Sequence, residues 1–186
     1  MKNIADHILD IAENAVRAEA KKIEILLSIN TTSHLMKLSF IDDGIGMSEE
    51  MVEKIKDPFF STRDTRRIGM GIPLLMQNSE MSGGQVVISS TEGEGTIVVA
   101  TFQMDDIDCP PLGDVAEAIY FLSSSHLDIR FVFDYKYGDA SYTWDTESVS
   151  QALDGLALDH HKVKEPLMEM LRTNIRIVEE DADTDE

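Results

Sequence analysis

Cysteine is nearly absent from this chain of 186 residues, since Cys109 is the only one. A disulfide within the chain is therefore excluded, and a reducing compartment suits the sequence. No apolar run approaches the roughly 20 residues that a membrane-spanning helix needs. A signal peptide is not expected either, because Asp6 and Asp10 interrupt the stretch where its apolar region would lie. These absences predict a cytoplasmic protein that does not enter a membrane.

Basic residues are also scarce, with 16 Lys and Arg against 35 Asp and Glu and a net charge of −19. After residue 104 the chain holds 20 of those acidic residues and only 6 of the basic ones. Nucleic acid and anionic lipid are therefore not expected as partners. One stretch departs from this trend, because five basic residues fall within fourteen positions: Lys54, Lys56, Arg63, Arg66 and Arg67. Such a patch suits an anion such as a triphosphate, with a solvated loop as the alternative on charge alone.

Hydrophobic periodicity divides residues 1–104 into helices and strands. Helices are predicted over residues 4–19, from Ser48 onward, and from Gly71 to the glycines at 83–84. Strands are predicted over residues 23–29, 35–41, 85–90 and 96–102. Residues 57–68 show no periodicity, so we expect an exposed loop there.

The run DDIDCPP at 105–111 breaks this pattern, and we place a domain boundary after residue 104. Residues 105–178 are predicted to form a small α+β domain, with helices near 113–123, 147–154 and 165–177 and a strand over 128–138 that pairs with SYTW. The acidic tail 179–186 is expected to be disordered. Alternation puts an aromatic stripe on one face of the strand: Phe131, Phe133, Tyr135 and Tyr137. This stripe predicts a core face, with a dimer or partner surface as the alternative.

Four segments stand in an informative order: LDIAENAVRA at 9–18, IDDGIGM at 41–47, DPFFSTRDTRRIGMGIPLL at 57–75 and GEGTIVVATF at 93–102. In this order and spacing they resemble the ATP-binding domain shared by histidine kinases, DNA gyrase B subunits, mismatch-repair ATPases and large heat-shock chaperones. The resemblance covers about residues 1–104. It implies an α/β fold of the Bergerat type, an α+β two-layer sandwich in which helices back a mixed sheet, with ATP and Mg²⁺ as ligands.

The resemblance gives roles to the residues around the base and the metal. Asn14 stands where the family has a Mg²⁺ ligand, and a hard cation accepts an amide oxygen; on its own, Asn14 would suit an exposed helix face. Asp42 begins the pattern D-x-G-x-G and would accept a hydrogen bond from the adenine amino group, where guanine presents a carbonyl. Gly44 and Gly46 would let the backbone approach the base, and Met47 ends the motif.

The later motifs indicate which residues would bind the phosphates of ATP. Gly69, Met70 and Gly71 match a second glycine box at the start of a helix, where N–H groups and the helix dipole favour phosphate. The preceding PFFST resembles the lid of histidine kinases. Thr96, in the third box, is implied to support the phosphate and the lid, with a plain hairpin turn as the alternative. Three lid residues are candidates for one phosphate contact: Arg63, Arg66 and Arg67.

Asp10 precedes Asn14 by one helical turn, so the two side chains share a face. Superfamily members that activate water or a serine hydroxyl resemble one another in placing a glutamate there, whereas histidine kinases tend to have asparagine. We predict that Asp10 is a general base, directly or through a water; the alternative is that it orders Mg²⁺-bound water. Glu13 is the reserve candidate. His7, in the same helix, is expected to be an ordinary hydrogen-bonded or solvated histidine.

The predicted function is transfer of the γ-phosphoryl group of ATP to a protein partner, with slow hydrolysis as the side reaction. Because the chain begins at the nucleotide helix, the phosphoacceptor hairpin of histidine kinases is not expected. A non-catalytic ATP-dependent switch is the alternative, and it would tolerate Asp10→Asn. An ATPase clamp like that of mismatch repair is a further alternative. The partner stays unnamed, and a homodimer stays open.

Overall fold

The computed structural model describes residues 2–56 and 70–183. The strands are β1 (Lys22–Asn30), β2 (Leu35–Asp42), β3 (Val86–Thr91), β4 (Gly95–Gln103), β5 (Arg130–Tyr137) and β6 (Ala140–Asp145). The helices are α1 (Ile4–Arg17), α2 (Glu49–Lys56), α3 (Gly71–Met81), α4 (Val115–Ser125), α5 (Thr146–Ala152) and α6 (His161–Asp183). Every helix and strand expected from the sequence is present, with boundaries shifted by a few residues.

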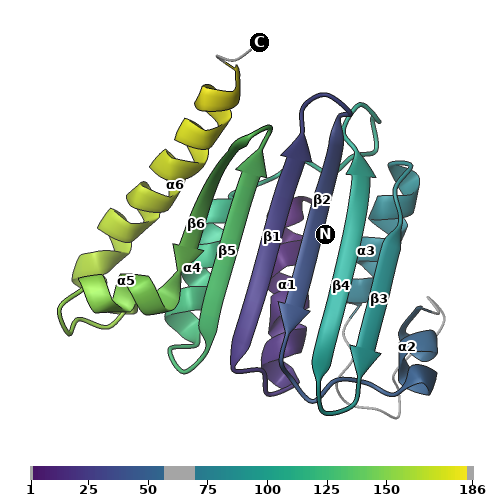
Figure 1. Cartoon of the computed structure of the whole chain (residues 1–186), viewed down its shortest axis with the longest axis horizontal. Coiled ribbons are helices and arrows are strands. Elements are labelled where there is room, and N and C mark those ends of the chain that lie inside the picture. The colour runs from purple at the N-terminus through teal and green to yellow at the C-terminus, as the bar shows by residue number, and fades with distance from the viewer. Residues whose placement is uncertain (1, 57–69, 184–186) are drawn as a thin grey trace.

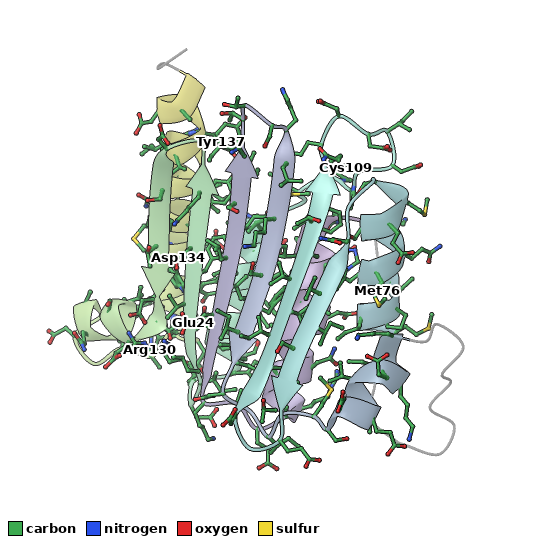
Figure 2. All side chains as sticks on the ribbon, turned by 45° about the vertical axis from the view of Figure 1, so that its right-hand side comes forward. Glu24, Met76, Cys109, Arg130, Asp134 and Tyr137 are labelled. Atoms are coloured by element: carbon green, nitrogen blue, oxygen red, sulfur yellow. The ribbon has the colours of Figure 1, made fainter. Side chains whose placement is uncertain are left out.

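The strands form one mixed sheet in the order β3-β4-β2-β1-β5-β6. β1 and β5 run parallel, and the other neighbours are antiparallel. Helices α1, α3, α4 and α6 lie on one face of this sheet (Figure 1). Glu24, Arg130 and Asp134 lie on the opposite face, which no helix in the described part of the chain covers (Figure 2). The predicted two-layer α+β sandwich is confirmed. No helix in residues 2–56 and 70–183 has the length and hydropathy needed to cross a bilayer.

Helix α1 forms because its apolar residues repeat at helical spacing and fit the sheet. Ile4, Ile8 and Ile11 are at most 4% exposed, and each such burial contributes roughly 1.5–3 kcal/mol. The side chain of Asn3 caps the helix, because its Oδ1 accepts the N–H of Asp6 at 2.8 Å. The polar face of α1 therefore points away from the core with Asp10 and Asn14 on it.

The segment after residue 104 completes the sheet of the segment before it. β5 pairs with β1 over eight positions, from Lys22 opposite Arg130 to Ile29 opposite Tyr137. Residues 105–178 therefore extend the first sheet, and the expected boundary falls in the loop between β4 and α4. A period-two pattern shows that a strand exists and which face it buries, but it does not show which strand it will pair with.

The C-terminal elements refine two further expectations. Phe131, Phe133 and Tyr135 are at most 2% exposed, so this part of the aromatic stripe is core and not a free partner surface. Helix α6 continues to Asp183, so residues 179–183 are helical where disorder was expected. Contact with the sheet accounts for the difference, because the hydroxyl of buried Tyr135 donates to Glu179 Oε1 at 2.7 Å.

Both ends of α1 are held by the later segment. The N–H groups of Ile4 and Ala5 donate to the carbonyl oxygens of Pro111 and Leu112, each at 2.9 Å. These are N–H groups that a helix leaves without a partner of its own. At the other end Glu13 Oε1 lies 2.9 Å from His126 Nε2, just after α4. Residues 105–183 therefore fix the position of the helix that carries Asp10 and Asn14.

A chain that ends after residue 104 should not fold cooperatively. It would make β1 an edge strand, remove the strand that flanks it, and take away the carbonyl oxygens that accept the N–H groups of Ile4 and Ala5. The measurement is urea unfolding followed by far-UV circular dichroism, with the full chain as reference. A single cooperative transition for residues 1–104 would instead support an independent N-terminal domain.

His7 is fully buried on α1 where this helix meets α3. Its Nε2 lies 2.9 Å from Asn78 Nδ2 on α3, and its Nδ1 has no partner in the described part of the chain. Burial lowers the pKa of His7 to about 4, with the N-terminal charge acting in the same direction. His7 is therefore a neutral core histidine, in agreement with the expectation that it is hydrogen-bonded.

This lowered pKa predicts a loss of stability in mild acid. The unfolded chain takes up a proton near pH 6.5 while the folded chain resists until about pH 4, so His7 stabilises the fold fully above pH 6.5 and progressively less below it. Between pH 7 and pH 4.5 the free energy of unfolding should fall about 2–3 kcal/mol more in wild type than in His7→Asn. Urea unfolding at both pH values tests this, with exposed His161→Asn as a control that follows wild type. Parallel pH profiles for wild type and His7→Asn would contradict it.

Candidate functional site

A cavity of about 350 Å³ opens between α1, α2 and the ends of strands β2 and β4. Five residues singled out in the sequence lie in its wall: Asn14, Asp42, Gly46, Met47 and Thr96. They come from segments up to 82 positions apart, and the sheet brings them together. The remaining wall is largely apolar, which suits a flat ring system with a few fixed polar contacts.

Asp42 forms the polar anchor at one end of the cavity. Its Oδ1 accepts the N–H of Gly44 at 2.9 Å, and the carboxylate also accepts the N–H of Thr96. Burial raises the pKa of Asp42 above its ordinary value, in spite of these hydrogen bonds. Thr96 lies directly opposite Asp42 in the register of β2 and β4, so the two side chains share this end. The resemblance had implied a place for Thr96 beside the phosphates and the lid instead.

The first and third glycine boxes touch through their backbones. Gly46 has a φ of 65°, and a Cβ placed there would lie 1.9 Å from the carbonyl oxygen of Thr91. The N–H of Gly93 donates to the carbonyl of Ile45 at 2.7 Å across the same contact. At Gly44 a Cβ would meet the carbonyl oxygen of Ala18 at 2.7 Å. Only glycine fits positions where the backbone comes this close.

The other end of the site lies where α1 meets the start of α3. A Cβ at Gly71 would lie 3.2 Å from the Cβ of Asp10 and 3.7 Å from Asn14 Nδ2. The structure thus places Asp10, Asn14 and the first residue of α3 side by side, with Asp10 exposed to solvent. Met70 is the N-cap of α3 and provides no side-chain cap, and its own side chain is exposed. Within the described residues no side chain caps this helix start, which suits the binding of an anion by its N–H groups.

Four predicted contacts lie outside the described residues: Arg63, Arg66, Arg67 and Gly69. Arg17 was missed by the sequence reasoning and lines the cavity. Its Nη1 donates to Asn14 Oδ1 at 3.2 Å. The spacing of three residues from Asn14 on one helix could have indicated it. The apolar wall was also missed, because these residues follow the core pattern: Ile11, Ala15, Phe40, Ile45, Met51, Ile55, Ile72 and Val98.

Glu13, the reserve candidate for a general base, is engaged elsewhere. Its Oε1 lies 2.9 Å from Nε2 of His126, and both side chains are largely buried. Asp10 is therefore the acidic group beside Asn14 and Gly71.

The oxygen donors at this end suit a magnesium ion. Asn14 offers an amide oxygen and Asp10 a carboxylate, and Mg²⁺ takes such ligands while keeping water and phosphate oxygens for its other positions. No group of three or more His, Cys, Asp or Glu side chains in residues 2–56 and 70–183 could hold a metal unaided. A cation would replace Arg17 as the partner of Asn14 Oδ1.

Comparison with known proteins identifies the family of the segment that carries these residues. The family described as histidine kinase-, DNA gyrase B-, and HSP90-like ATPase matches residues 3–106, which is more than half of the chain. The chain belongs to this ATPase family. The family match implies that this kinase-like ATPase domain binds ATP, and its bounds enclose every predicted site residue.

Similar curated proteins are kinases that are much longer than this chain. An uncharacterized sensor-like histidine kinase of Rhizobium meliloti is 29% identical over 103 residues, which cover 53% of this chain and 20% of that protein. The sensor histidine kinase WalK of Bacillus subtilis is 30% identical over 114 residues, which cover 54% of this chain and 19% of that kinase. Sporulation kinase E of Bacillus subtilis is 29% identical over 91 residues, or 48% and 12% of the two chains. The chain thus spans a fifth or less of these relatives, and the similarity concerns the ATPase domain.

Proposed function

We propose that this protein transfers the γ-phosphoryl group of ATP to a protein partner, with slow hydrolysis as a side reaction. The observation that carries the proposal is the meeting of Asp10 and Asn14 with Gly71 at the start of α3, beside the cavity that Asn14 lines. This arrangement places a carboxylate, a metal-type oxygen ligand and helix N–H groups around one point. The kinases among the similar proteins support transfer over simple binding.

Each residue has a separate task in this scheme. Asp42 accepts a hydrogen bond from the adenine amino group, and the N–H groups at Gly71 bind phosphate oxygens. Asn14 would hold Mg²⁺, and the ion would supply positive charge beside the phosphates. Phosphoryl transfer depends mainly on such positioning and charge neutralisation, so the small number of polar groups suffices.

The chemical step needs one proton acceptor. As an oxygen or nitrogen of the acceptor bonds to the γ-phosphorus, the bond from that phosphorus to the bridging oxygen breaks and ADP leaves with the electron pair. The Asp10 carboxylate takes the proton of the attacking group, directly or through a water. Its exposed position suits this task, because the acceptor must reach it from solvent. One of Arg63, Arg66 and Arg67 would add positive charge from the lid.

A nucleotide-dependent switch is the second candidate. The observation that favours it is the attachment of α1 to residues 105–183 at both ends, through Pro111, Leu112 and His126. Nucleotide bound at Asn14 would then change the position of the C-terminal segment. A switch requires that ATP change the affinity for the partner, because a ligand shifts two states only by its differential affinity.

The proposal also includes a cellular location and a class of partner. A cytoplasmic location fits the single Cys109 and the need for ATP. The partner is a protein rather than nucleic acid, because a chain with net charge −19 repels polyanions.

Asp42→Asn should weaken ATP binding about 10- to 100-fold, because it removes the charged acceptor at the base end. Isothermal titration calorimetry with ATP and Mg²⁺ measures the effect. Asp43→Asn is the matched control, since the Asp43 carboxylate accepts the N–H groups of Lys21 and Lys22 outside the cavity wall. Equal ATP affinity for Asp42→Asn and wild type would exclude Asp42 as the anchor of the base.

Asp10→Asn should leave ATP affinity within about threefold and lower phosphoryl transfer and hydrolysis by about 100-fold or more, because only proton acceptance is lost. The assay follows γ-labelled ATP and scores protein-bound label and free phosphate separately, with cell extract as the source of acceptor. Glu13→Gln is the control and should stay active, because Glu13 is paired with His126. If wild type binds ATP but yields neither protein-bound label nor free phosphate, the nucleotide-dependent switch becomes the better proposal.

A further inference from the structure

Ser90, near the end of the edge strand β3, makes three hydrogen bonds where the first and third glycine boxes meet. Its Oγ accepts the N–H of Met47 at 2.8 Å. The same Oγ donates to the carbonyl oxygen of Gly95 at 2.8 Å and lies 2.9 Å from Oγ1 of Thr96. Ser90 does not line the cavity, but two of its three partners, Met47 and Thr96, do.

Ser90 also stands in register with the residues of the base end. It lies opposite Thr96 in the pairing of β3 with β4, and Thr96 lies opposite Asp42 in the pairing of β4 with β2. Residues directly opposite one another in a sheet project from the same face. Ser90, Thr96 and Asp42 therefore form one row across three strands, with Thr96 in the middle.

Counting hydrogens fixes the direction of each bond. A serine hydroxyl has one hydrogen to donate and two lone pairs. The carbonyl oxygen of Gly95 can only accept, so the hydrogen of Ser90 goes there. The N–H of Met47 can only donate, so it takes one lone pair of Ser90. The remaining bond to Thr96 is then made with the hydrogen of Thr96, which points toward Ser90 and leaves Thr96 lone pairs for the cavity.

The direction of the Thr96 hydroxyl determines which base fits beside Asp42. Asp42 and Thr96 side by side both present acceptors, which suits the amino group of adenine. The carbonyl of guanine at the same place would face two acceptors without a hydrogen between them. Thr96 could donate a hydrogen bond to the guanine carbonyl only by turning its hydrogen away from Ser90. The hydrogen bond between Thr96 and Ser90 would then be lost.

We propose that Ser90 is a positioning and specificity-determining residue of the nucleotide site, which orients the Thr96 hydroxyl and the Met47 backbone so that adenine is preferred over guanine. This inference rests on the proposed binding of ATP. Ser90 acts through Thr96 and Met47 and does not itself touch the nucleotide.

Ser90→Thr and Ser90→Val form the matched pair for the test, because they have nearly the same shape and only the first keeps the hydroxyl. The dissociation constants for Mg-ATP and Mg-GTP are measured by isothermal titration calorimetry, beside urea unfolding of each variant. Ser90→Val should raise the dissociation constant for Mg-ATP about 10-fold. It should also reduce the ratio of the Mg-GTP to the Mg-ATP dissociation constant at least about threefold. Ser90→Thr should keep both quantities within about twofold of wild type, as should Ser89→Val on the opposite face of β3.

The ratio of the GTP to the ATP dissociation constant distinguishes a Ser90 that orients Thr96 from a Ser90 that only stabilises the fold. Loss of stability alone would weaken ATP and GTP equally, so an unchanged ratio in Ser90→Val overturns the proposal. Equal impairment of Ser90→Thr and Ser90→Val overturns it too, because the hydroxyl would then not matter. If Ser90→Val does not fold, the smaller Ser90→Ala is judged by the same ratio. Absence of ATP binding in wild type would overturn both the proposed function and this inference, whereas wild-type binding with an unchanged ratio overturns only the latter.

Discussion

The packing of α1 on the sheet is the interaction on which the rest of this structure depends. Its apolar face, with Ile4, Ile8 and Ile11, joins the core, and the adjoining polar face carries Asn14 in the cavity wall and Asp10 beside it. Burial of three isoleucines at roughly 1.5–3 kcal/mol each makes the orientation of the helix costly to change. The helix cannot rotate about its axis without exposing these isoleucines. Their burial therefore fixes the direction in which Asp10 and Asn14 point.

The C-terminal segment adds a second constraint on the same helix. Strand β5 pairs with β1 in the sheet, and the loop before α4 accepts the first free N–H groups of α1. The bond from Glu13 to His126 links the residue beside Asn14 to the end of α4. A segment outside the family match at residues 3–106 is thus joined to both ends of α1 and to β1. In the proposed nucleotide-dependent switch, this connection would carry a change at the phosphates to residues 107–183.

Close backbone approach is the constraint at the base end. Gly46 and Gly95 each occupy a position where a Cβ would lie 1.9 Å from a carbonyl oxygen, of Thr91 and Asp42 respectively. Side chains cannot fill this space, so the two turns meet main chain to main chain, and Ser90 adds the side-chain bonds between them. A contact between backbones at this end of the cavity leaves little to be ordered when a ligand enters, which favours affinity.

The sequence by itself determined the elements, the family and the chemical types at the site. Helical spacing identified the buried face of α1, alternation identified the buried face of β5, and the order of the glycine motifs identified Asn14, Asp42 and Thr96 as residues of one site. These features are local or depend on order along the chain, so they can be seen without coordinates. The same reasoning placed a domain boundary after residue 104, because a strand pattern does not name its neighbour.

Only the tertiary structure decided what depends on contact between distant segments. It joined β5 to β1 in one sheet, engaged Glu13 with His126, placed Gly71 against Asp10, and gave Ser90 its three partners. Serine and glutamate are common at polar positions, and nothing in their sequence neighbourhood distinguishes a solvated side chain from one that holds a site together. Such roles arise from the pairing register and helix packing, which are set by the fit of the whole core.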